Sequence, residues 1–75
     1  MSKLPVVSGK ELVNALEKAG FIIVRQKGSH VSLQKITSEG THRTVVPLHT
    51  KIAKGTLIDI LHQTGLSKEE LIDLL

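Results

Sequence analysis

The chain has 75 residues, 40% of them hydrophobic, which is enough for one small domain with one core and too little for two. It has no cysteine, which excludes disulfide bonds and thiolate sites, and it has no apolar run near the roughly 20 residues of a membrane helix. Lys and Arg number 10 against 7 Asp and Glu, for a net charge of +3. We therefore expect a soluble, cytoplasmic protein with no membrane partner and no signal peptide.

The charge is unevenly distributed along the chain. Residues 1–55 carry nine Lys and Arg against three acidic residues, whereas residues 56–75 carry one Lys against four acidic residues. A basic body with an acidic tail favours a polyanionic partner for the body. The alternative interpretation is an ordinary solvated surface with a slight excess of positive charge.

The first predicted element is a helix over Gly9–Ala19. Ser8 and Glu11 have the spacing of a capping box, in which each satisfies a free amide of the other at the start of a helix. Apolar residues then recur at intervals of three and four, and Gly20 stands where a left-handed residue ends a helix.

Three short strands are predicted next, over residues 21–27, 30–35 and 43–47. The first is rich in β-branched residues and the second alternates polar and apolar side chains. Turns at Gly28-Ser29 and at residues 37–40 separate them. Sequential strands joined by short turns form an antiparallel meander.

Two helices complete the chain. One spans residues 55–64 and ends at Gly65, and the other begins after a second capping box at Ser67 and Glu70. The order α-β-β-β-α-α predicts a single α+β domain over residues 1–75, with a three-stranded antiparallel sheet and helices on one face. Double-stranded RNA-binding domains have this arrangement, and the likeness raises the expectation of an RNA partner without establishing a function.

The residue types exclude several kinds of chemistry. The basic part of the chain has too few carboxylates for a two-metal nuclease, and there is no His pair at helical spacing to hold zinc. No phosphate loop or dinucleotide fingerprint is present. We expect no metal and no cofactor, so any catalysis would use His, Lys, Arg, Ser or Thr.

His30 is the histidine best placed for catalysis. It follows a turn, opens a strand on that strand's polar face, and has Arg25 and Lys27 just upstream. An imidazole exchanges protons near neutral pH and can take the proton of a ribose 2′-hydroxyl, while nearby cations stabilise the crowded phosphate. For His42 and His62 we expect surface positions, and a structural or merely exposed role is the alternative for His30 as well.

Two lysines flank the predicted start of the second helix. Helix N-termini attract phosphate, so Lys51 and Lys54 suggest contacts to an RNA backbone, although a solvated helix face is the alternative. The single aromatic residue, Phe21, argues against recognition by base stacking and is expected in the core. Any RNA contact would then have a weak sequence preference.

Several stretches resemble the HicA (YcfA-like) mRNA interferase toxins of type II toxin–antitoxin systems. Among them are Gly28-Ser-His30, Val46-Pro-Leu-His49 and Thr64-Gly-Leu-Ser67, and together the stretches extend over nearly the whole chain. The remaining matching stretches are residues 4–12, 16–21, 24–27, 55–57 and 60–61.

The resemblance implies an endoribonuclease with a fold like a double-stranded RNA-binding domain, which cleaves mRNA and arrests translation and growth. It implies a HicB antitoxin that masks the active site, with DNA contacted only through the antitoxin complex. His30 falls on the family's catalytic His, and Val31 replaces a second His that many members have, which leaves His49 as the next proton donor. The expected RNA-binding residues are Arg25, Lys27, Gly28, Ser29, Lys51 and Lys54.

Two other functions remain open at this point. The same fold could serve as a non-catalytic RNA-binding module, which would bind in a salt-dependent way and leave RNA intact. A weaker alternative is a domain whose only partner is another protein, and the acidic C-terminal helices are compatible with it.

Overall fold

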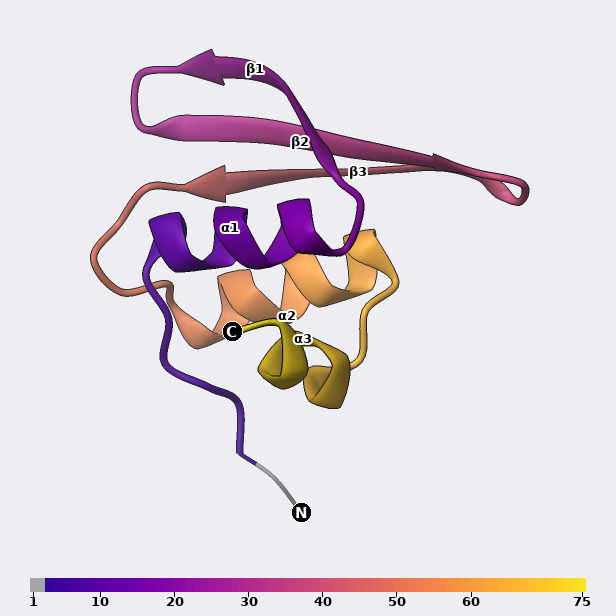
Figure 1. The fold of residues 1–75 in the computed structure, drawn as a ribbon. Helices are drawn as coiled ribbons and strands as arrows, with labels where there is room; N and C mark the ends of the chain where they lie inside the picture. Colours follow the sequence, from indigo (N-terminus) through magenta and orange to yellow (C-terminus); the bar gives the residue numbers. More distant parts are fainter. Residues whose placement is uncertain (1–2) are drawn as a thin grey trace.

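The helices and strands follow one another in the predicted order. A computed structural model describes residues 3–75, which form a three-stranded sheet and three helices. Figure 1 shows how these elements are arranged. The sheet is antiparallel with strand order β1-β2-β3. The elements are α1 (Gly9–Lys18), β1 (Ile22–Lys27), β2 (His30–Thr37), β3 (Gly40–Pro47), α2 (Lys54–Thr64) and α3 (Lys68–Leu74).

The predicted α+β fold is therefore confirmed, with small differences at the ends of elements. β3 begins at Gly40, earlier than expected, because residues 37 and 40 pair directly across a two-residue turn. The hydroxyl of Thr37 closes this turn by donating to the Gly40 carbonyl at 3.1 Å. Ala19 is the C-terminal cap of α1 and not its last residue.

Both predicted capping boxes are present. In α1, the Ser8 hydroxyl accepts from the Glu11 amide at 3.0 Å, and the Glu11 carboxylate accepts from the Ser8 amide at 2.9 Å. Ser67 and Glu70 make the same pair of bonds at the start of α3. Each box satisfies amides that the first turn of a helix leaves free.

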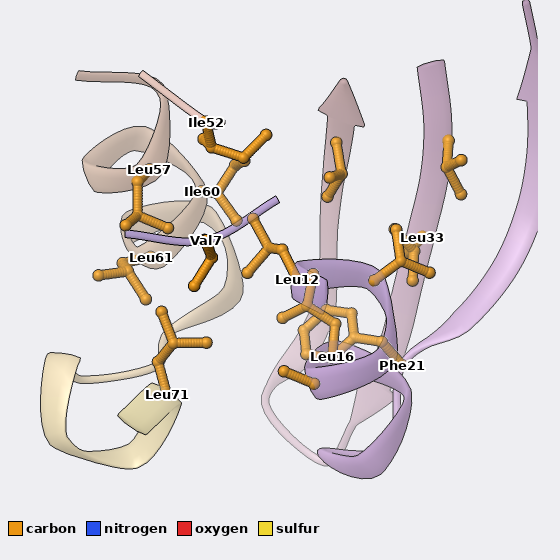
Figure 2. Close-up of a cluster of buried hydrophobic side chains, with 14 residues drawn as sticks. Val7, Leu12, Leu16, Phe21, Leu33, Ile52, Leu57, Ile60, Leu61 and Leu71 are labelled. Carbon is orange, nitrogen blue, oxygen red and sulfur yellow. The ribbon is translucent and has the colours of Figure 1, made fainter. Parts of the chain in front are cut away.

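The core lies between the sheet and the helices. Leu33 of β2 points toward Leu12 and Leu16 of α1 (Figure 2). These three side chains and Val46 of β3 are fully buried. Phe21 is also buried, as predicted. All three helices lie on the same side of the sheet (Figure 1). The rest of the core consists of Val7, Val13, Ala15, Val31, Ile52, Leu57, Ile60, Leu61 and Leu71.

His42 does not occupy the surface position that we expected. It is half-buried on the inner side of β3, and its Nδ1 lies 3.3 Å from the carbonyl oxygen of Gln63 at the end of α2. The neighbouring Thr44 hydroxyl donates to the Gln63 side chain at 2.7 Å. The expectation was wrong because β3 extends back past His42 and alternation turns this residue toward α2. His62 is exposed, as expected.

The carboxylate of Glu70 links the stability of α3 to pH. The backbone amide of Ser67, with smaller help from its hydroxyl and from Lys35, holds the pKa of Glu70 below its ordinary value. The folded chain therefore gains stability from the ionised carboxylate above the unfolded-state pKa, and it loses this gain as pH falls through the folded-state pKa.

We expect Glu70→Gln to be less stable than the wild type at neutral pH, with a difference that shrinks on acidification. Urea unfolding at neutral and acidic pH measures it. Glu17→Gln removes the same charge from an exposed position of α1 whose side chain, unlike that of Glu70, makes no capping hydrogen bond, and it serves as the control. If Glu70→Gln lowered the free energy of unfolding by the same amount at neutral and acidic pH, the result would contradict this linkage.

No helix in the described part of the chain is both long and apolar enough to span a membrane.

Candidate active site

A tight hairpin turn places His30 at the head of β2. Lys27 and His30 pair directly across the turn, with Gly28 and Ser29 between them. Gly28 has φ +58°, and it alone of the two central residues has a positive φ. This pattern is that of a type II′ turn, which requires glycine at its first central position. The turn holds His30 opposite Lys27 at one end of the sheet, where His30 begins the central strand.

The β3–α2 loop, which carries His49, is hydrogen-bonded to this turn. The Leu48 amide donates to the Ser29 carbonyl at 2.6 Å, so the chain leaving β3 runs beside the β1–β2 turn. The His49 carbonyl in turn accepts from the Gly9 amide at 2.9 Å. In Figure 1 the β1–β2 turn, the β3–α2 loop and the starts of α1 and α2 lie at the same end of the molecule. His49 is thus brought to the neighbourhood of His30, and both side chains are exposed.

Gly9 allows α1 to approach the end of β3 closely. A Cβ at this position would lie 2.1 Å from the Pro47 carbonyl oxygen and 2.7 Å from the Leu48 Cα, distances that only glycine avoids. Gly9 therefore supports the site although it touches neither histidine ring. Sequence reasoning missed this role, because nothing near Gly9 in the sequence indicates that residues 47 and 48 pack against it.

Strand register places Arg25, Lys27 and His30 on the face of the sheet that no described helix covers. Val31 and Leu33 of β2 are buried toward the helices, so His30 and Ser32 point the other way. Residues paired across antiparallel strands share a face, and Arg25 pairs with Ser32. We call this surface the open face. Its residues are Ile22, Arg25, Lys27, His30, Ser32, Gln34, Ile36, Thr41, Arg43 and Val45.

A β-bulge in β1 makes this arrangement possible. The register shifts between Ile23, which pairs with Leu33, and Arg25, which pairs with Ser32. In a regular strand residues 23 and 25 would share a face, whereas here Ile23 is on the inner side and Arg25 on the open face. The bulge thus lets one short strand supply an apolar residue to the helix side and cations to the side of His30.

The open face is positively charged. It carries Arg25, Lys27 and Arg43, and none of its residues is acidic. Sequence reasoning did not select Arg43, although its spacing from Val45 on one strand indicates that both lie on the same face. The Arg43 guanidinium donates to the Gln34 side chain at 2.9 Å across the β2–β3 pair.

Lys51 and Lys54 are not part of the open face. They line a separate open cavity of about 660 Å³ beside the start of α2, together with Lys3 and Lys68. None of the residues that line this cavity is acidic. The predicted RNA-binding residues therefore divide into two basic groups, one on the sheet around His30 and one at the N-terminus of α2.

The described residues contain no group of three or more His, Asp or Glu side chains arranged to hold a metal ion. The chemically active groups that surround the β1–β2 turn are imidazoles and cations.

The sequence profile of a protein family described as the HicA toxin of bacterial toxin–antitoxin systems matches residues 9–66, which is more than half of the chain. The matched segment begins at Gly9 and contains His30 and His49. It also contains every residue of the two basic groups except Lys3 and Lys68. No match was found among curated protein sequences.

Proposed function

Because the chain belongs to the HicA toxin family of bacterial toxin–antitoxin systems, we propose that it is an endoribonuclease that cleaves mRNA in the cytoplasm without a metal ion and so arrests translation and growth. The observation that carries this proposal is the position of His30, exposed at the head of β2 and paired with Lys27 on a face without acidic residues. Such a face attracts RNA and presents a proton-transferring group to it.

The reaction uses the ribose 2′-hydroxyl as the nucleophile. Its oxygen attacks the adjacent phosphorus, the bond to the 5′-oxygen of the next nucleotide breaks, and a 2′,3′-cyclic phosphate remains. One group removes the 2′-hydroxyl proton and another returns a proton to the leaving oxygen. We assign one of these two transfers to His30 and give the other to His49, whose loop is bonded to the β1–β2 turn.

Cations and backbone groups around His30 bind the substrate phosphates. Lys27 and Arg25 stabilise the negative charge that develops on the scissile phosphate, because both lie on the face of His30. Gly28 leaves open space at the turn, since no atom lies within 4 Å of where its Cβ would be, and a backbone can approach there and at Ser29. Lys51 and Lys54 hold a more distant part of the RNA in their cavity.

Membership of the family implies a cognate antitoxin. We propose that this antitoxin is a HicB protein that covers the basic face around His30, and that DNA is contacted only through the toxin–antitoxin complex. Carboxylates on the antitoxin would complement Arg25 and Lys27, which are both exposed.

A cleavage assay with purified protein tests the proposed reaction. We expect an oligoribonucleotide to be cut at an unchanged rate in excess chelator, with products that end in 2′,3′-cyclic phosphate. The same oligonucleotide with a single 2′-deoxyribose at the scissile position should survive, because the nucleophile is missing.

Cutting of the deoxy-substituted substrate at a comparable rate would rule out the 2′-hydroxyl route. Loss of activity in chelator would instead show that the reaction needs a metal. Binding without any cleavage would favour the non-catalytic RNA-binding module.

A further inference from the structure

The open face extends well beyond His30 and remains basic. Along β2 the outward residues after His30 are Ser32 and Gln34, and Gln34 pairs with Arg43 of β3. Gln34 lies four residue steps along β2 from His30, so Arg43 lies about 13 Å along the sheet from the histidine. This distance is too long for Arg43 to contact the phosphate at which His30 acts.

The Arg43 guanidinium is oriented over the open face. Its bond to Gln34 is a single contact at 2.9 Å, which leaves most of its five donor positions available. Arg43 is exposed, and no acidic residue shares the face with it. A guanidinium in this setting matches the geometry of a phosphate group.

On the basis of the proposed function, we propose that the open face carries a single strand of RNA that runs from His30 toward β3, and that Arg43 binds a backbone phosphate of a nucleotide next to the cleaved one. Charge complementarity selects the occupant, because the open face carries cations on both sides of β2, with Lys27 and Arg25 on β1 and Arg43 farther along the sheet on β3. Arg43 is a binding residue in this arrangement and takes no part in proton transfer.

The occupant is a single strand and not a duplex. Attack by the 2′-hydroxyl requires the nucleophile, the phosphorus and the leaving oxygen to lie in line, and the regular geometry of an A-form helix prevents this. Unpaired bases also need a surface, and the open face offers Ile22, Ile36 and Val45, which are 58%, 72% and 45% exposed. These side chains are aliphatic, so they contact bases without stacking and select weakly among sequences.

Salt-dependent binding separates this role from a structural one. In a His30→Ala background, which removes cleavage from the measurement, we expect Arg43→Gln to bind a single-stranded oligoribonucleotide roughly tenfold more weakly at low salt. The slope of log affinity against log salt should fall by about 0.7, the value for one phosphate contact on a single strand. Arg43→Lys keeps the charge and should retain that slope.

The matched control is Lys18→Gln. Lys18 is an exposed cation in the last turn of α1, on the helical side, where its Nζ donates to the Leu74 carbonyl at 3.3 Å. This substitution removes one positive charge from the protein without touching the open face. It should leave the salt slope of RNA binding unchanged.

Cleavage assays with His30 intact separate a failure of the proposed RNA path from a failure of the proposed nuclease function. With His30 intact, Arg43→Gln should raise KM and leave kcat close to the wild-type value. Wild-type RNA cleavage with unchanged binding by Arg43→Gln would overturn the RNA path over the open face and leave the nuclease function standing. An open face that serves an acidic protein partner would give this result. Arg43-dependent binding without any cleavage by the wild type would overturn the nuclease function and support the path.

Discussion

Substitution of His30 by alanine is expected to abolish the growth arrest and mRNA loss that induced expression of the wild-type chain causes. A positioned proton-transferring group contributes about 10²- to 10⁴-fold to a rate, so cleavage by purified His30→Ala should fall by at least about 100-fold. Fold and RNA binding should persist, because the side chain is exposed and makes no core contact. Total mRNA integrity on a gel and the rate of oligonucleotide cleavage measure the effect.

His62→Ala is the matched control for this experiment. It removes an exposed imidazole from α2, and we expect it to remain as toxic as the wild type. Equal toxicity of His30→Ala and the wild type would assign the chemistry to another group, and His49→Ala would be measured next. If the wild type itself leaves growth and mRNA unchanged, the nuclease function is contradicted.

The second large effect is expected from Gly9→Ala. The added methyl group would overlap the Pro47 carbonyl oxygen and the Leu48 Cα, and both of these are backbone atoms that cannot rotate away. Overpacking of this kind costs about 1–3 kcal/mol, and each kcal/mol lowers the melting temperature of a domain this size by about 4–8 °C. Thermal unfolding followed by circular dichroism measures the loss.

The same substitution should also reduce cleavage in the fraction that remains folded. Relief of the overlap moves Pro47 and Leu48, and the Leu48 amide is bonded to Ser29 at the turn that carries His30. We therefore expect a lower kcat at temperatures at which the variant is still folded. This effect would show that the close approach of α1 positions the turn.

Gly55→Ala is a matched control for the effect on stability. Gly55 lies in α2, where a Cβ would meet no atom within 4 Å, so alanine should stabilise the helix by about 0.5–1 kcal/mol. The two glycine substitutions should thus shift the melting temperature in opposite directions. A wild-type melting temperature for Gly9→Ala would contradict the packing of α1 against the end of β3.

The sequence by itself determined the elements and their order. Each helix start or end that was predicted well depends on residues a few positions apart, such as the pairs Ser8 and Glu11, and Ser67 and Glu70. The same is true of the turn at Gly28, which brings Lys27 opposite His30. Local chemistry of this kind is visible in the order of residues, because the interacting groups are neighbours along the chain.

Only the tertiary structure decided which of the candidate residues lie together. The bulge after Ile23 placed Arg25 on the face of His30, and bulges have no distinct sequence pattern when, as here, no glycine marks them. Long-range packing also decided that Lys51 and Lys54 lie apart in their own cavity and that His42 packs toward α2. These relations depend on contacts between distant parts of the chain, which folding creates and which the spacing of residues does not encode.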